Sequence, residues 1–451
     1  NVMKKKISVF INSKIDKFNK TISVESDKSI SHRSLLIASQ CIGLSKISNL
    51  LEGDDVKNTI SCLQKLGVKI IKKNKNYIVH GNGLGSFKKP KENTLYAGNS
   101  GTLARMLLSL LATQPNLKVK LIGDHSLNKR DMKRVIEPLA KIGCNFYPKN
   151  KNSLPITIEG TGIPLAQKHF ETIGSAQVKS AILLAALNTP GVTNLEVSKV
   201  SRNHTENLLS KIKADIKIKN KKKGHIISLR GKKNLFSFNL KIPGDPSSAA
   251  PFIILTLLTP ASKLIIKNIN CNPTRTGFIN ILKKMNANIK IKNINIKSGE
   301  PVGDIIVKSS SLKSINSPTS LVPSAIDEFP LLFIASSVIS GTSTFNGIGE
   351  LRNKESDRIK SIEKGLNQIG IKTKSTKNSL KIFGNPNLQI KKTLKISPQE
   401  DHRVAMSFFC LGQLLNGKVQ INNFQTVNTS FPKFLSTVKK IGGSFEVKKN
   451  N

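Results

Sequence analysis

The sequence predicts a repeat-built α/β protein, because one pattern recurs six times along its 451 residues. In each copy a strand is followed by a polar turn, an amphipathic helix, a small residue and an alternating strand. The small residues stand 71 to 83 positions apart, at 67, 143, 214, 287, 370 and 442. One such unit cannot bury its apolar face alone, so the copies are expected to pack as one ring or as two groups of three.

The final copy shows the helical period most clearly. Its apolar residues share one face of a predicted helix and are Phe431, Phe434, Leu435, Val438 and Ile441. Gly442 follows, where a left-handed cap costs glycine least. In every copy the small residue is expected to end the helix, and a strand is expected directly after it.

A turn sequence between the third and fourth copies favours two groups of three. Gly244-Asp245-Pro246 interrupts the repeat, and a matching crossover is expected near the amino terminus. The expected domains are 25–243 and a second one formed by 1–24 with 244–451, joined by crossovers near 24–28 and 242–246.

Composition excludes several broad classes. The longest apolar stretches, such as 252–258 and 331–335, are far shorter than a membrane span. No apolar h-region follows the basic start, so no secretory signal is expected, and Met3 is a candidate natural start. Five scattered cysteines without a Cys-x-x-Cys pair are typical of reduced thiols in a cytosol, and not of a disulfide framework or a zinc site.

The formal net charge of +45 raises the alternative of nucleic-acid binding. Most of the 72 basic residues are lysines spread through turns and strand ends, and only ten are arginines. Aromatic residues make up 5% and tryptophan is absent, so stacking platforms for single strands are scarce. We therefore expect the lysines to cover solvated faces and to attract small anions, with no nucleic-acid partner.

Several turns in the first half place cations at predicted helix starts. Residues 27–34 supply Lys28, Ser29 as a cap, and Arg33 one turn further on the same face. This arrangement favours phosphate or carboxylate, with a plain capped surface helix as the alternative. Three further turns follow the same principle: the glycine-rich 98–102, the cationic 123–130 at another helix start, and the small polar 174–180.

The second half supplies acids beside further cations. Asp327 and Glu328 precede a helix with Pro330 in its first turn, where acids also serve the helix dipole. Lys354 and Arg358 are four positions apart and are expected on one helical face, which needs acids or an anion to offset them. Asp401 is expected to cap a helix that carries Arg403.

Seven of the ten arginines lie in or beside turn motifs: 33, 105, 130, 202, 352, 358 and 403. In a lysine-rich chain this placement indicates planar, bidentate contacts to phosphate and carboxylate. No Walker-type phosphate loop, nucleophile elbow or metal-ligand spacing occurs. The residues therefore predict a transferase of anionic groups that uses Lys, Asp and Glu as proton carriers.

Taken together, the segments closely resemble the 5-enolpyruvylshikimate-3-phosphate synthases (3-phosphoshikimate 1-carboxyvinyltransferases). The residues of several segments are most similar to those of the subgroup called class II. Matching segments occur in family order at 27–34, 98–102, 175–181, 187–192, 201–206, 244–249, 327–330, 351–358 and 401–403. The resemblance implies two domains of three β-α-β-α-β-β units each, the inside-out α/β barrel of the enolpyruvyl transferase fold. It implies transfer of the enolpyruvyl group of phosphoenolpyruvate to the 5-hydroxyl of shikimate-3-phosphate, in aromatic amino acid (chorismate) biosynthesis.

The resemblance also implies roles for residues that match the family's motifs. Contacts to shikimate-3-phosphate are expected from Lys28, Ser29, Arg33, Ser175, Ala176, Gln177, Arg202, Asp327 and Lys354. Contacts to phosphoenolpyruvate are expected from Lys28, Gly101, Arg130, Gln177, Arg358 and Arg403. Asp327 is the expected base for the 5-hydroxyl, and Lys28 and Glu355 complete proton transfer. A cytoplasmic monomer without metal, cofactor, nucleic acid or membrane is expected.

Four positions modify this expectation. Asp131, Asn203 and Thr429 depart from residues common in the family, Thr429 standing where other relatives carry a phosphate-binding lysine. Gly101, alanine in some relatives, leaves room for the inhibitor glyphosate, so sensitivity is expected.

The nearest rival interpretation is a UDP-N-acetylglucosamine enolpyruvyl transferase, which shares the sixfold architecture. That enzyme typically uses a cysteine on a mobile loop, and no cysteine lies between Cys62 and Cys144. Cys144 is expected to be buried at a strand start. The rival from another class is an RNA-binding or RNA-phosphate-processing protein, favoured only by the charge.

Overall fold

The computed structural model describes residues 6–449. Their internal contacts divide them into two compact units. Unit 1 comprises 6–25, Gly244–Asn295 and 301–449, and unit 2 comprises Ser26–Pro243 and Ile296–Glu300. The short excursion at Ile296–Glu300 is the tip of a hairpin and was not expected from the sequence. Among residues 6–449, no helix is both long and apolar enough to cross a membrane.

Six four-stranded sheets confirm the sixfold repeat. In unit 2 their strand orders are β14-β3-β5-β4, β6-β7-β9-β8 and β10-β11-β13-β12. Their bounds are β3 Ile42–Ser48, β4 Lys69–Lys73, β5 Asn76–Asn82, β6 Thr94–Tyr96, β7 Lys118–Ile122, β8 Asn145–Tyr147, β9 Ile156–Glu159, β10 Lys168–Glu171, β11 Val192–Val197, β12 Ile216–Asn220, β13 His225–Arg230 and β14 Asn239–Lys241.

Unit 1 repeats the arrangement, with orders β16-β17-β15-β2, β18-β19-β21-β20 and β22-β23-β1-β24. The bounds are β1 Ile7–Ile11, β2 Asn19–Ile22, β15 Lys263–Asn270, β16 Asn288–Lys297, β17 Glu300–Lys308, β18 Asn316–Ser317, β19 Gly341–Asn346, β20 Lys372–Ser375, β21 Ser379–Gly384, β22 Leu394–Ile396, β23 Val419–Ile421 and β24 Glu446–Lys449.

Every sheet joins one parallel pair to two antiparallel pairs. In the second sheet of unit 2, β6 and β7 are parallel with Leu95 opposite Leu121, and β7 and β9 are antiparallel with Leu121 opposite Ile156. In four sheets the two parallel strands follow one another with a helix between them, which is the usual connection for a parallel pair: β6 and β7, β10 and β11, β18 and β19, and β22 and β23. In the other two sheets the parallel pairs join strands that are far apart in the sequence, β14 with β3 and β15 with β2.

The helices fall into two classes that alternate along the chain. One class is buried on nearly all sides: α1 Lys28–Ser39, α3 Gly101–Ala112 and α6 Ala176–Leu187 in unit 2, and α8 Pro246–Leu258, α11 Phe329–Ser337 and α13 His402–Leu414 in unit 1. The other class is amphipathic: α2 Asp54–Lys65, α5 Lys133–Ile142, α7 His204–Lys211, α9 Gly277–Lys284, α12 Arg358–Gln368 and α14 Phe434–Lys440.

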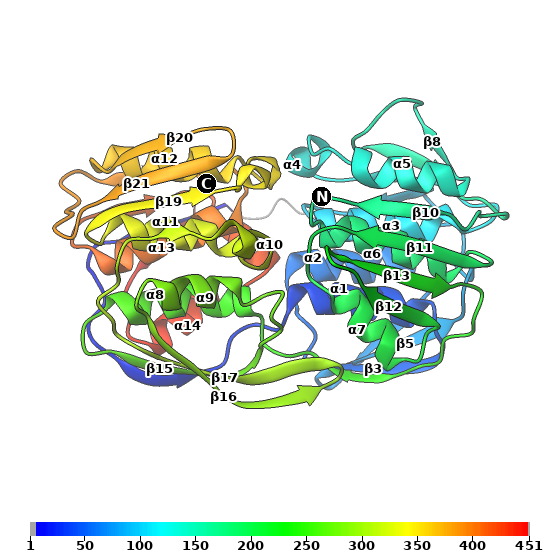
Figure 1. The fold of residues 1–451 in the computed structure, drawn as a ribbon, viewed down its shortest axis with the longest axis horizontal. Helices are drawn as coiled ribbons and strands as arrows, with labels where there is room; N and C mark the ends of the chain where they lie inside the picture. The colour runs from blue at the N-terminus through cyan, green and yellow to red at the C-terminus, as the bar shows by residue number, and fades with distance from the viewer. Residues whose placement is uncertain (1–5, 450–451) are drawn as a thin grey trace. The chain divides into compact units, whose positions relative to one another are not determined.

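The buried helices of each unit pack on one another inside the sheets (Figure 1). In unit 2, α3 packs on α6 and α1 on α3; in unit 1, α11, α13 and α8 contact one another. A helix that is apolar nearly all round has to be enclosed, which explains the central position of most of them; α1 also buries polar residues, among them His32 and Arg33. Each of the motifs at 27–34, 98–102, 174–180, 244–249, 327–330 and 401–403 opens one of these helices. The fold thus brings three motif-bearing helix starts to each unit.

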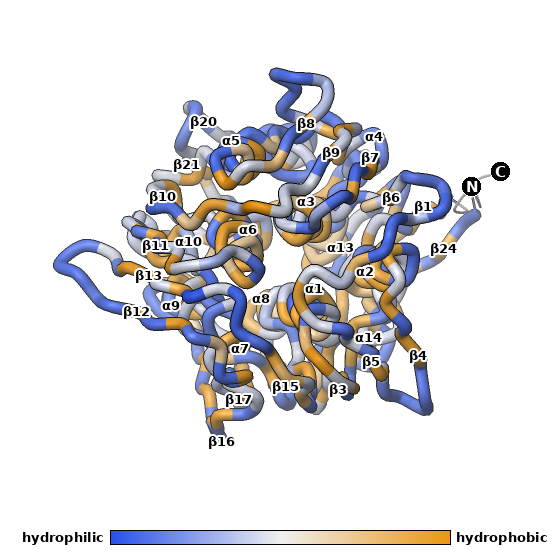
Figure 2. The backbone as a smooth tube through the Cα atoms, turned by 90° about the vertical axis from the view of Figure 1, so that its right-hand side faces the viewer, coloured by the Kyte–Doolittle hydropathy of each residue, from blue (hydrophilic) through white to orange (hydrophobic). Residues whose placement is uncertain are grey.

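Lysines concentrate on the outermost strands of the sheets. Five edge strands carry at least two lysines each: β4, β12, β16, β20 and β24. Figure 2 shows the tip of the β12–β13 hairpin of unit 2 in blue, whereas α6 is largely orange. Charged edge strands resist pairing with other chains, so much of the positive charge has a structural use.

Several local expectations need correction. Helix α14 begins at Phe434, so Phe431 precedes it, although the two rings still pack 5.4 Å apart. In the two copies that carry alanine at 214 and 287, the left-handed residue is one position earlier, at Lys213 and Asn286. Alanine resists that conformation, and asparagine tolerates it.

Candidate functional site

The amino terminus of α1 is capped by Asp27, and not by Ser29 as the sequence indicated. The Asp27 carboxylate accepts a hydrogen bond from the backbone of Ile30 at 2.8 Å. Lys28 is the first helical residue, and its Nζ lies 3.1 Å from Oδ2 of Asp55. Asp55 belongs to the first turn of α2 and is not among the residues predicted for the site. The acidic pair Asp54-Asp55 at a helix start was the available signal.

Arg33 ties α1 to two other elements of unit 2. Its guanidinium donates to the Ser29 carbonyl at 3.0 Å, to Ser180 Oγ at 3.0 Å and to Thr205 Oγ1 at 2.8 Å. Arg202 Nη1 donates to Ser29 Oγ at 3.3 Å. The predicted residues Ser29, Arg33 and Arg202 therefore lie together, and the buried Arg33 also holds the backbone of the α1 tip.

The starts of α3 and α6 form a second part of this cluster. Ser100 caps α3 and Ser175 caps α6 through their hydroxyl oxygens. Gln177 donates to Thr102 Oγ1 at 3.0 Å and accepts from Arg105, for which the sequence predicted no substrate contact. Glu171 fixes the turn before α6, because its carboxylate accepts from three successive backbone amides, those of residues 173, 174 and 175.

Arg130 reaches the start of α3 from the segment between α4 (His125–Asn128) and α5. Its Nη1 lies 2.7 Å from the point that a Cβ atom on Gly101 would occupy. Lys129 and Arg130 thus follow a short helix, whereas we expected them at a helix start. Asp131 stabilises this turn through two hydrogen bonds. Its carboxylate accepts one from the Lys133 amide at 2.7 Å, and its backbone carbonyl accepts one from Arg105 at 3.2 Å.

His32 is buried between these helix starts. Nδ1 lies 2.7 Å from Thr59 Oγ1 and Nε2 lies 3.5 Å from Ser100 Oγ. Burial, followed by the charges of Lys28 and Arg33, holds the pKa of His32 well below its ordinary value of 6.5. The imidazole is therefore neutral and links α1 to α2 and to the cap of α3.

This burial predicts a pH-dependent contribution to stability. The unfolded chain binds a proton at His32 below about pH 6.5 and the folded chain does not, so stability falls as the pH drops. The slope is at most about 1.4 kcal/mol per pH unit for one group. We expect the stability deficit of His32→Gln to shrink between pH 6.5 and 5, measured by urea unfolding. A deficit that is constant with pH would contradict the neutral assignment.

Unit 1 carries a compact acid–arginine cluster. Arg358, the first residue of α12, is buried, with 1% of its side chain exposed. Its Nε lies 2.9 Å from Asp401, its Nη2 2.7 Å from Glu355 and its Nη1 3.2 Å from Asp327. Burial opposes the charge of Arg358, but the three carboxylates outweigh it and raise the pKa of the guanidinium. The predicted residues Asp327, Glu355 and Arg358 are thus in direct contact.

Lys354 and Arg403 complete the predicted residues of this unit. Lys354 is half-buried in extended backbone after the turn η3 (Gly349–Asn353), so it does not share a helical face with Arg358. Arg403 is buried, and Nη1 donates weakly to the Ser247 carbonyl at 3.4 Å. Among residues 6–449, Arg403 Nε and the buried hydroxyl of Thr429 have no hydrogen-bond partner. Asp401 caps α13, as expected.

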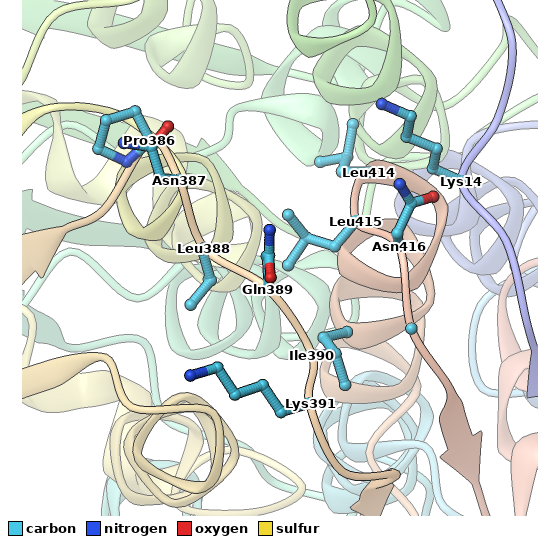
Figure 3. A pocket seen from close by; sticks show the side chains of 11 residues that line it. Lys14, Pro386, Asn387, Leu388, Gln389, Ile390, Lys391, Leu414, Leu415 and Asn416 are labelled. Carbon is cyan, nitrogen blue, oxygen red and sulfur yellow. The ribbon is translucent and has the colours of Figure 1, made fainter.

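A cavity of about 560 Å³ lies elsewhere in unit 1 (Figure 3). It is lined by the loop 386–391, by Lys14 and by residues 414–417 at the carboxyl end of α13. Arg403 occupies the other end of α13, and a helix of this length spans about 20 Å. The cavity is therefore separate from the acid–arginine cluster. No group of three or more His, Cys, Asp or Glu in the described part of the chain is arranged to hold a metal ion.

Comparisons with known proteins agree with this architecture. Residues 12–438 match the family model of EPSP synthase (3-phosphoshikimate 1-carboxyvinyltransferase). Proteins named 3-phosphoshikimate 1-carboxyvinyltransferase from Zymomonas mobilis and Petrotoga mobilis are 41% and 42% identical, covering 94% of this chain and 94% and 98% of theirs.

Solved structures give the same result. An EPSP synthase from Acinetobacter baumannii superposes with a TM-score of 0.84 at 36% identity, over 98% of this chain and all of that one. The enolpyruvyl transferase NikO from Streptomyces tendae has a TM-score of 0.77 at 12% identity and shows the shared fold alone. With its sixfold architecture and motif-bearing helix starts, the chain belongs to the EPSP synthase family.

Proposed function

We propose that this chain transfers the enolpyruvyl group of phosphoenolpyruvate to the 5-hydroxyl of shikimate-3-phosphate and releases inorganic phosphate, a step of the shikimate pathway. The observation that carries the proposal is the contact of Arg358 with Asp327 and Glu355. An arginine fork beside two carboxylates supplies both an anion-binding group and proton carriers. Family membership and the 94% coverage of the relatives support the same reaction.

The reaction divides into addition and elimination. In the first step the 5-hydroxyl oxygen bonds to C2 of phosphoenolpyruvate, its proton passes to Asp327, and C3 gains a proton. In the second step C3 loses a proton and the C2–O bond to phosphate breaks, which leaves the enolpyruvyl ether. Lys28 and Glu355 carry the protons at C3. Lys28 already has a carboxylate neighbour in Asp55, which fixes its position.

The remaining residues bind the two anionic substrates. Ser29, Arg33, Ser175, Ala176, Gln177, Arg202 and Lys354 contact shikimate-3-phosphate, together with Lys28 and Asp327. Gly101, Arg130, Gln177, Arg358 and Arg403 contact phosphoenolpyruvate, again with Lys28. Each phosphate carries about −1.5 to −2 charge at neutral pH, so clustered cations are needed for both. Arg403 supports this role, because its buried Nε has no partner among residues 6–449.

We further propose that the enzyme acts as a cytoplasmic monomer, without a metal, an organic cofactor or a nucleic-acid partner, and that glyphosate inhibits it. All five cysteines are buried and unpaired, which suits a reducing compartment. A phosphate-release assay with both substrates, and with each one omitted, tests the central proposal. Release that needs both substrates is expected. Salt-sensitive RNA binding without any release would favour the RNA-binding rival instead.

The cysteines also separate this function from that of a UDP-N-acetylglucosamine enolpyruvyl transferase. Cys144 and Cys62 are buried, and burial raises the pKa of each thiol to about 12. Neither thiol is therefore reactive at neutral pH. We expect Cys62→Ala and Cys144→Ala to keep kcat within about threefold and both thiols to react slowly with iodoacetamide in the folded chain. Loss of turnover in either variant that still folds would favour the cysteine-dependent rival.

A further inference from the structure

A charged pair lies in the interior of unit 2, and neither of its residues is among those assigned to substrates. Lys179 on α6 and Glu206 on α7 form an ion pair of 2.9 Å, with side chains 0% and 2% exposed. Lys179 is among the largest fully buried side chains of the chain. Removing two charges from water is costly, and well-packed apolar residues of similar size often stabilise a fold as well or better. Core packing alone therefore does not explain this pair.

The pair contacts the loop 198–203, which joins β11 to α7. Lys179 Nζ donates to the Ser201 carbonyl at 3.4 Å. Ser201 directly precedes Arg202, whose guanidinium reaches Ser29 Oγ at the tip of α1. The loop has no helix or strand of its own, and its amino end is held by one backbone hydrogen bond from Ser198 to Glu171.

Two further observations describe the surroundings of the pair. The backbone amide of Lys179 bonds to the carbonyl of Ser175, so Lys179 lies one turn below the cap of α6. The buried hydroxyl of Ser201 and Oε1 of Glu206 have no hydrogen-bond partner among residues 6–449. Lys179 therefore connects α6, one turn below its cap, to the loop that carries the Ser201 hydroxyl and the Arg202 guanidinium.

We propose that the Lys179–Glu206 pair is a positioning element for shikimate-3-phosphate. By holding the Ser201 carbonyl, Lys179 fixes the placement of Arg202 and of the Ser201 hydroxyl relative to Ser29 and Ser175. Glu206 in turn holds the ammonium group in place from the first turn of α7. Neither residue touches the substrate. This inference rests on the proposed function, because it concerns binding of one of its two substrates.

The test compares Lys179→Met, Glu206→Gln and the double variant Lys179→Met/Glu206→Leu with wild type. Lys221→Met is the matched control, since Lys221 pairs with Glu196 on the surface of the same unit. For each protein we would measure kcat, the KM of both substrates, direct binding of shikimate-3-phosphate by calorimetry, and the melting temperature. The double variant matters because a single variant leaves one buried charge alone and can fail to fold.

In Lys179→Met we expect the KM and the Kd for shikimate-3-phosphate to rise about tenfold or more, the size of one lost positioning contact. The KM for phosphoenolpyruvate and kcat should stay within about threefold. The double variant should regain the melting temperature without regaining affinity for shikimate-3-phosphate. A purely structural role predicts that affinity and melting temperature recover together.

Two results would overturn the inference: a folded Lys179→Met protein whose KM for shikimate-3-phosphate is within twofold of wild type, or a double variant that recovers both affinity and stability. Lys221→Met should match wild type throughout. Absence of phosphate release by the wild-type protein would instead defeat the proposed function. The two failures are therefore distinguishable.

Discussion

Asp327→Asn is expected to lower kcat by about 10²–10⁴-fold, the range typical for removal of a general base. The Asp327 carboxylate accepts a hydrogen bond from Arg358 Nη1 at 3.2 Å, and 17% of the Asp327 side chain is exposed. The carboxylate is therefore held in position and is still accessible from solvent. Asparagine preserves the shape and one acceptor oxygen but does not take up a proton at neutral pH. The KM for shikimate-3-phosphate should therefore change much less than kcat, as steady-state phosphate release would show.

The control for this prediction is Asp357→Asn. Asp357 belongs to the same unit, pairs with Arg352 at 2.8 Å and caps α12 through the amide of Lys360. Asparagine caps a helix nearly as well as aspartate, so this variant should keep near-normal turnover. If Asp327→Asn also kept turnover within a few-fold, its assignment as the base would be wrong, and Glu355 would be the next carboxylate to test.

The architecture was predictable from local signals. Each repeat carries its own apolar period and a small residue after its helix, and these are read within about twenty residues of chain. The cap at Asp401 and the burial of Cys144 followed from the same kind of signal. The prediction of a helix cap was wrong where two nearby residues can both cap the helix, as with Asp27 and Ser29 at the start of α1. Both side chains can cap a helix, and only the backbone geometry decides between them.

The contacts that position the predicted site residues were not predictable. Arg33 bonds to Ser180 and Thr205, which lie 147 and 172 positions away in the sequence. Asp55 meets Lys28 only because α1 packs on α2. A single sequence carries no signal for such pairs, since a buried Lys or Glu has the same letter as an exposed one. The motifs therefore reveal which helix starts carry the chemistry, but not the network of side chains beneath them.

Gly101→Ala is expected to raise the KM for phosphoenolpyruvate about tenfold or more and to raise the glyphosate concentration needed for inhibition. A methyl group at Gly101 would lie 2.6 Å from Arg105 Nη1 and 2.7 Å from Arg130 Nη1, closer than van der Waals contact allows. Both atoms end flexible side chains, so the arginines shift and the fold survives. Loss of a charge-assisted hydrogen bond costs about 1.5–3 kcal/mol, which corresponds to about 10- to 150-fold in affinity.

Gly162→Ala provides the matched control in the same unit, because its Cβ would approach only Pro115, at 3.3 Å. The double variant Gly101→Ala/Arg130→Lys tests whether the effect of Gly101→Ala on the KM for phosphoenolpyruvate depends on Arg130. If the methyl group acts by displacing Arg130, its effect on the KM for phosphoenolpyruvate should be much smaller once Arg130 is already replaced, since residues in contact do not contribute additively. Equal effects of Gly101→Ala in both backgrounds would show that the methyl group acts elsewhere, and Arg105, which holds Gln177, would then be the residue displaced.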